Sequence, residues 1–115
     1  MHLVHFTEVE REKVDDPEAK GASIRWAIDG KVGAPTFAMR VFDVEPGGYT
    51  PYHEHWNEQE MFVLEGQGKI IGPSGPHDLS QGTVIYVEPY EPHRIENTGS
   101  GVLRFICCIP LEKPD

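Results

Sequence analysis

Short β-rich segments alternate with turn residues along most of the chain, and this alternation is its dominant pattern. From residue 23 onward, apolar and β-branched runs of four to eight residues are separated by glycine, proline, asparagine or aspartate. We expect strands at 23–28, 37–44, 50–56, 60–65, 69–72, 83–87, 93–96 and 102–109. About eight to ten short strands at such regular spacing predict an all-β fold, an antiparallel sandwich or barrel.

The connections are predicted from their turn chemistry. We expect loops or turns at 29–30, 46–48, 66–68, 73–76 and 78–82, which are rich in glycine, proline and aspartate. Residues 7–19 are charged and interrupted by Pro17, so this segment is expected to form a loop or one irregular turn. A short N-terminal strand that carries His2 and His5 is expected, and residues 111–115 are expected to fray.

Composition narrows the class of protein. A chain of 115 residues suits one domain, 1–115, and its 12 glycines and 10 prolines fit many turns. The net charge of -9 argues against a nucleic-acid partner, and no apolar stretch is long enough to cross a membrane. With no signal-peptide pattern, and with Cys107 and Cys108 adjacent on one strand and so unable to pair, we expect reduced thiols and a cytoplasmic protein.

A His-x-His triplet carries the clearest chemical signal. His53 and His55 would point to the same face of a strand, and His93 follows in a later one. Neutral imidazole is a common ligand for divalent metals, so these residues indicate a mononuclear metal site. Surface histidines are the alternative for the pair taken alone.

The surroundings of these histidines resemble two sequence motifs of the cupin family. The first, about 47–66, is similar to Gly-x5-His-x-His-x3or4-Glu-x6-Gly and matches at Gly47, His53, His55 and Gly66. The second, about 82–97, is similar to Gly-x5-Pro-x-Gly-x2-His-x3-Asn and matches at Gly82, His93 and Asn97. Glu88 and Tyr90 depart from the second motif, at its proline and its second glycine.

The resemblance implies a jelly-roll barrel, the cupin double-stranded β-helix. Residues 60–66 and 105–110 further resemble small bacterial and archaeal cupins with a four-histidine manganese site, a group that includes a thermophile protein with alkene-cleaving oxygenase activity. The resemblance therefore implies one divalent transition metal: Mn, Fe, Ni, Cu or Zn, with Mn or Fe favoured. Small cupins commonly dimerise through added edge strands, so a homodimer is expected.

The fourth metal ligand is open between two neighbouring residues. Counting back from Gly66 selects Gln59, whereas counting on from His55 selects Glu60, and the two side chains would lie on opposite faces of a strand. We favour Gln59, because the four-histidine cupins place a histidine there and an amide oxygen can bind a metal. Glu60 is then the candidate general acid or base, although a weak one.

Further candidates would line a substrate pocket beside the metal. If Arg104 faces outward, alternation along the last strand sends Phe105 and Cys107 together to the inner face. Tyr52 and Arg40 are added, Arg40 as a binder of a substrate anion if it points inward and as an exposed arginine otherwise.

The leading functional hypothesis is a metal-dependent enzyme, an oxygenase or a lyase/isomerase, acting on a small organic molecule in the barrel. The alternative is a non-catalytic module that binds a small molecule or a metal, and a third possibility is a purely structural cupin with an empty site.

Overall fold

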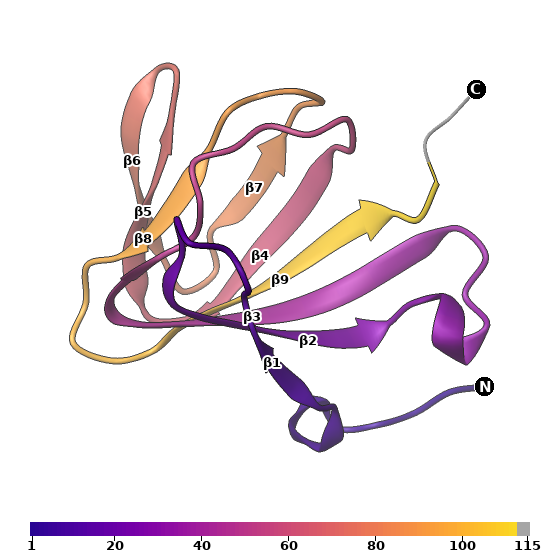
Figure 1. The fold of residues 1–115 in the computed structure, drawn as a ribbon. Helices are drawn as coiled ribbons and strands as arrows, with labels where there is room; N and C mark the ends of the chain where they lie inside the picture. Colours follow the sequence, from indigo (N-terminus) through magenta and orange to yellow (C-terminus); the bar gives the residue numbers. More distant parts are fainter. Residues whose placement is uncertain (113–115) are drawn as a thin grey trace.

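Antiparallel strands make up the fold, which is seen in a computed structural model that describes residues 1–112 (Figure 1). Two single-turn 3₁₀ helices, η1 (Phe6–Glu8) and η2 (Gly30–Val32), accompany the strands. The strands are β1 (Arg11–Lys13), β2 (Lys20–Ile28), β3 (Phe37–Tyr49), β4 (Gln59–Glu65), β5 (Gln67–Gly72), β6 (Gly75–Ser80), β7 (Val84–Val87), β8 (Arg94–Asn97) and β9 (Leu103–Pro110). The all-β prediction is confirmed. Within residues 1–112, no helix is long and apolar enough to cross a membrane.

The strands form one curled sheet in the order β6-β5-β8-β3-β9-β4-β7, with β2 also paired to β3 and β1 to β2. The long strand β3 is the corner of this sheet. Its first part, 37–44, pairs with β2 and β9, whereas Tyr49 at its end pairs with Glu96 of β8. Figure 1 shows the consequence: the β5–β6–β8 group stands across from the β4, β7 and β9 strands.

Alternation along the strands separates an inner from an outer face. Leu103, Phe105 and Cys107 of β9 are buried inside, and Arg104 lies on the outer face, as the sequence predicts. The same alternation buries Met61 and Val63 of β4. These side chains belong to the hydrophobic core. Met61, Phe105 and Cys107 also line the site described below.

Glycine carries β3 through a segment that the sequence assigns to a loop. Residues 46–48 belong to β3, so that loop prediction is wrong. A side chain at Gly48 would meet the Lys20 carbonyl oxygen at 2.5 Å, and Gly47 has φ of 79°. Only glycine allows this close approach of β2 to a bulged β3, and the pairing continues through the glycines to Tyr49.

Further predictions about elements are wrong. Strand β1 lies within the expected loop 7–19, and residues 67–68 and 75–76 of two other expected loops belong to β5 and β6. The expected strand 50–56 is an extended loop with one isolated bridge, between His53 and His93. Residues 78–80 lie in β6 rather than in a turn, because β6 pairs with β5 in a tight hairpin. Residues 1–5 form no strand; His5 caps η1 instead. The expected fraying of 111–115 falls largely on residues 113–115, which lie outside the described part of the chain.

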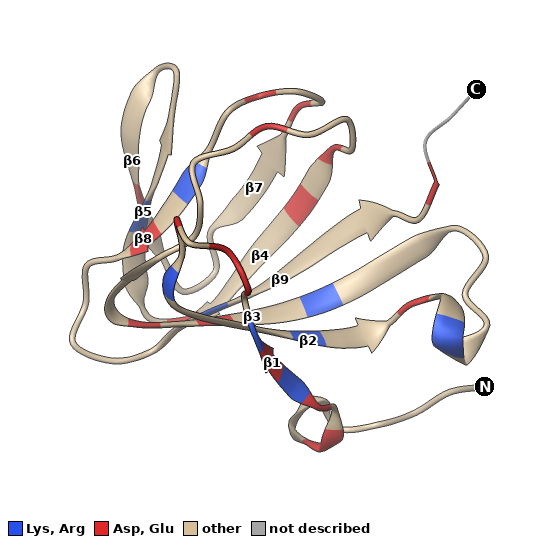
Figure 2. Cartoon of the chain, viewed as in Figure 1, with Lys and Arg blue, Asp and Glu red and all other residues tan. Residues whose placement is uncertain are grey.

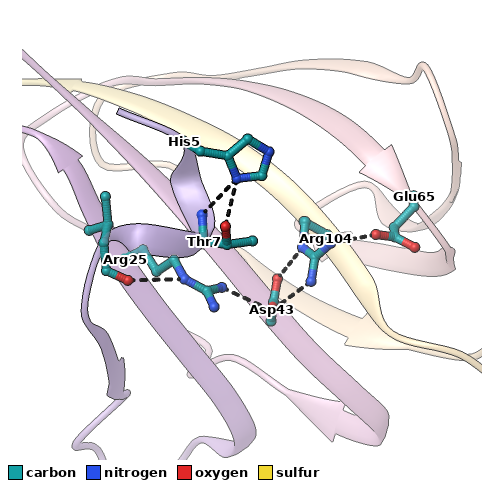
Figure 3. A network of polar contacts seen from close by, with 7 residues as sticks. His5, Thr7, Arg25, Asp43, Glu65 and Arg104 are labelled. Carbon is teal, nitrogen blue, oxygen red and sulfur yellow. Dashed lines mark hydrogen bonds and ion pairs between the residues drawn. The ribbon is translucent and has the colours of Figure 1, made fainter. Parts of the chain in front are cut away.

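A polar network on the outer face joins η1 to the sheet (Figure 3). The Asp43 carboxylate, 3% exposed, accepts from Arg104 at 2.7 Å and from Arg25 at 3.4 Å. Arg104 also pairs with Glu65, and both guanidinium groups lie over the ring of Phe6. The buried carboxylate is thus neutralised by two cations, as a buried charge requires.

Candidate metal centre

Three histidines converge at one end of the sheet. His53 and His93 are joined by a pair of backbone hydrogen bonds, and the His55 carbonyl accepts from the Tyr90 N–H at 2.7 Å. The three imidazole rings lie 5.1 Å apart, centre to centre, in each pair. Their ligand atoms all lie within 4.8 Å of one another, so the group is able to hold a metal ion. The structure therefore brings together the three histidines that the sequence proposes as ligands, although all three lie in loops just outside the named strands rather than on strands.

Backbone carbonyls orient two of the rings. His55 Nδ1 donates to the Asn57 carbonyl at 2.8 Å, and His93 Nδ1 donates to the Glu91 carbonyl at 2.8 Å. A carbonyl oxygen can only accept, so in each neutral ring the proton is on Nδ1 and Nε2 carries the lone pair. This arrangement is the usual one for metal-binding histidines.

The environment of the cluster favours the neutral form of His53 and His93. Burial lowers the pKa of His93 and the nearby His55 adds to the effect, whereas the hydrogen bond to the Glu91 carbonyl opposes it in part. The pKa of His53 is lowered first by desolvation and then by His93 and His55. Neutral imidazole is the form that binds a metal, so the cluster favours the competent protonation state near pH 7.

Gln59 and Glu60 lie on opposite faces of β4. Gln59 is 7% exposed and points inward, where its Nε2 donates to His55 Nε2 at 3.2 Å. Glu60 is exposed on the outer side and lies beside Glu58, and the pKa of Glu60 is raised by burial and by that carboxylate. Among the two candidates for fourth ligand, Gln59 is the one beside the histidines. Glu60 faces away from the histidines, so its position contradicts the prediction that it is the general acid or base.

A cavity of about 310 Å³ opens beside the histidines. His53, Gln59 and His93 line it, together with three residues that the sequence places in the pocket, Arg40, Phe105 and Cys107. Tyr52 is a correction: it is 45% exposed and is not part of this lining. The described cysteines are free thiols, as expected.

Sequence reasoning missed much of the cavity wall. Trp26 of β2, Phe42 of β3 and Met61 of β4 contribute apolar surface, and Asp15 and Asp16 stand on the loop after β1. The two aromatic residues have a readable signal, since each lies two residues along its strand from another lining residue, Ile24 and Arg40. The aspartates have none, because their loop carries no periodic pattern.

Acidic residues surround the site. Figure 2 shows them on the loop between β1 and β2 and on the two loops that carry the histidines. The latter are Glu54, Glu58, Glu88 and Glu91. They favour the approach of a cation toward three neutral imidazoles.

Comparison with known proteins decides the family. The family model for a cupin domain (Cupin_2) matches residues 40–109, a range that includes the three histidines and extends from β3 to β9. The chain belongs to the cupin family. Its curled all-β sheet is accordingly the jelly-roll barrel that the two motifs imply.

Several known proteins are similar to this chain. The polyketide cyclase RemF from Streptomyces resistomycificus is 35% identical with a TM-score of 0.92, and the match covers 100% of this chain and 82% of RemF. An uncharacterized protein of Methanocaldococcus jannaschii is 35% identical over 66 residues, which is 56% of this chain and 53% of that protein. An oxalate-binding protein of Thermotoga maritima is 33% identical over 67 residues, 57% of this chain and 55% of that protein. The chain therefore spans about half the length of these two curated relatives.

Proposed function

We propose that this cupin is a metal-dependent enzyme that catalyses a non-redox reaction of a carbonyl compound, of the cyclase or isomerase class. One observation carries the proposal: His53, Gln59 and His93 line the same cavity as apolar and aromatic residues. Metal-binding residues that line a mostly apolar cavity are typical of a catalytic metal site, because a substrate in the cavity can reach the metal; a structural site is closed by its protein ligands. The likeness to a polyketide cyclase along the whole chain supports cyclisation as the reaction class.

The donor set fits a divalent transition metal. His55 and His93 present Nε2 lone pairs to the cluster. A half turn of the Gln59 amide would withdraw its hydrogen bond from His55 Nε2 and direct its oxygen to the same place. Three imidazoles and one amide carry no charge, so a bound ion would keep its full positive charge for polarising a substrate carbonyl and acidifying the adjacent C–H.

The residues of the chain would supply position, exclusion of water and a proton acceptor. Met61 and Phe105 hold the substrate against the histidines in an apolar environment that strengthens electrostatic interactions. We assign proton transfer to Asp16, a carboxylate that lines the cavity and interacts electrostatically with His53. Asp16→Asn should lower turnover without lowering the metal content.

The test is catalysis by reconstituted protein. Protein loaded with Mn, Fe, Ni, Cu or Zn is incubated with linear 1,3-diketones that carry a further ketone placed to close a six-membered ring by aldol condensation with loss of water. Deuterium exchange at the central carbon and ring formation are followed by NMR. At least one metal form should exchange and cyclise, and His93→Gln should abolish both activities. His77→Gln, on exposed β6, is the matched control and should retain them. If every metal form binds the diketones yet none reacts, the enzyme proposal is wrong; consumption of O2 would instead indicate an oxygenase.

A second candidate function is non-catalytic binding of a small dicarboxylate, favoured by the likeness to an oxalate-binding protein. Oxalate should then raise the melting temperature of the metal-loaded protein while remaining unchanged itself. Decarboxylation or oxidation of oxalate would exclude pure binding, and no thermal shift would exclude oxalate.

A further inference from the structure

Arg40 is a cation on the inner wall of the cavity. In the sheet register it lies opposite Trp26 of β2 and opposite Cys107 of β9, and all three residues line the cavity. The Arg40 guanidinium carbon is 5.4 Å from the Trp26 ring centre and 5.0 Å from that of Phe42. These aromatic faces hold the guanidinium flat against the wall.

The charge of Arg40 lacks a carboxylate partner within residues 1–112. Arg25 and Arg104, on the outer face, share the Asp43 carboxylate (Figure 3). Arg40 instead donates from Nη2 to Cys107 Sγ at 3.0 Å, and its buried Nε has no hydrogen-bond partner in that part of the chain.

A thiol is a poor partner for this cation. Burial raises the pKa of Cys107, which the nearby Arg40 lowers only in part. Cys107 is therefore a neutral thiol near pH 7, and sulfur is a weak acceptor. A partly buried guanidinium with five donors and one weak acceptor is left with unmet hydrogen-bonding capacity. The carboxylates of Asp15 and Asp16 line the same cavity but form no ion pair with Arg40 within residues 1–112.

The same cavity reaches the histidine cluster, because His53 and His93 line it as well. Arg40 is close enough to His53 to lower the pKa of that imidazole. A ligand in the cavity thus meets a fixed cation on the β3 wall and the metal-binding cluster at the end of the sheet. Beyond Arg40 the wall is aromatic: Phe42 and Phe105 line the cavity and stack at 5.1 Å between ring centres with 10° between planes.

We propose that Arg40 binds the carboxylate of the substrate, and that the substrate class is a planar, unsaturated oxo acid. Its carboxylate accepts from the Arg40 guanidinium, its conjugated body lies along Trp26, Phe42 and Phe105, and its carbonyl faces the histidines. The carbonyl part of this assignment rests on the proposed function, whereas carboxylate binding by Arg40 does not.

The test uses two ligands of equal shape, 2-naphthoate and neutral 2-naphthamide, with metal-free and zinc-loaded protein in calorimetric titrations. Metal-free protein should bind 2-naphthoate about 10- to 100-fold more tightly than the amide, the range for a hydrogen bond to a charged group. Arg40→Met should remove this preference and keep the amide affinity, while Arg40→Lys should retain part of it. Arg11→Met, in exposed β1, is the control and should change nothing.

Two results would overturn the proposal: equal binding of both ligands by the wild type, or a preference that survives Arg40→Met. Amide binding by Arg40→Met shows that the variant is folded with its cavity intact. The outcomes also separate the two proposals. Carboxylate preference without turnover by any metal form refutes the catalytic function alone. Turnover of neutral diketones equal to that of oxo acids, unchanged by Arg40→Met, refutes the assignment of Arg40 alone.

Discussion

Substitution of Gln59 is expected to change the metal affinity of this cupin in a way that tests its role as the fourth ligand. Its Nε2 lies 3.2 Å from His55 Nε2, and the side chain is almost fully buried. Gln59→Met removes the polar donor while keeping an unbranched side chain of similar length. If the amide oxygen is a ligand, affinity for a divalent metal should fall by at least about 10- to 100-fold, the range typical of losing a group that only supports a ligand.

Gln59→Glu should act in the opposite direction. A carboxylate oxygen 3.2 Å from His55 Nε2 attracts a unit positive charge there by about 5 kcal/mol at an effective dielectric of 20. Desolvation of the buried carboxylate offsets several kcal/mol of this. A net gain of about 1–3 kcal/mol remains toward a divalent cation, which corresponds to about 5- to 150-fold tighter binding.

The assay is competition with a chromophoric chelator for Zn or Mn, at pH 7.5, with the metal content verified by elemental analysis. Glu60→Gln is the matched control, since Glu60 neighbours Gln59 on β4 but faces the opposite side. It should leave the affinity unchanged. The reasoning is refuted if Gln59→Met binds metal as tightly as the wild type, or if Glu60→Gln weakens binding as much as Gln59→Met does.

Three further predictions concern stability and assembly. Because the pKa values of His53 and His93 are lowered from 6.5 in the folded protein, the unfolded chain takes up more protons below about pH 6.5. The free energy of unfolding of the metal-free protein, measured in urea titrations, should thus fall as pH falls from 7 toward 5. His93→Gln should reduce this fall, and an equally steep fall in that variant would show that His93 does not contribute to it. Asn97 makes three hydrogen bonds of 2.8 Å, to Val44, Gly99 and Gly101, so Asn97→Ala should cost about 2–5 kcal/mol in the same assay; a loss under about 1 kcal/mol would count against it. Phe62 on the outer face is 44% exposed, and we expect a second copy of the chain to cover it in a homodimer. Light scattering should give twice the mass of one chain for the wild type and the mass of one chain for Phe62→Glu. A monomeric wild type would exclude the homodimer.

Local sequence patterns are sufficient for the all-β class and for the inner face of β9. Alternation has a period of two residues on any strand, so the order of residues alone assigns Leu103, Phe105 and Cys107 to one side. The spacing of His53, His55 and His93 likewise indicates a metal-binding group, and the fold brings these residues together. The pattern fails where the backbone departs from regular strands, at 46–48 of β3.

Tertiary structure alone decides which faces meet. Periodicity places Gln59 and Glu60 on opposite sides of β4, but only the pairing of β4 with β7 and β9 sets Gln59 inside and Glu60 outside. It also decides the surroundings of Arg40, because Trp26 and Cys107 come from strands far away in the sequence. A sequence determines the order of side chains along each strand. The packing of distant strands around a common core determines which charges are neutralised and which, as at Arg40, face a cavity.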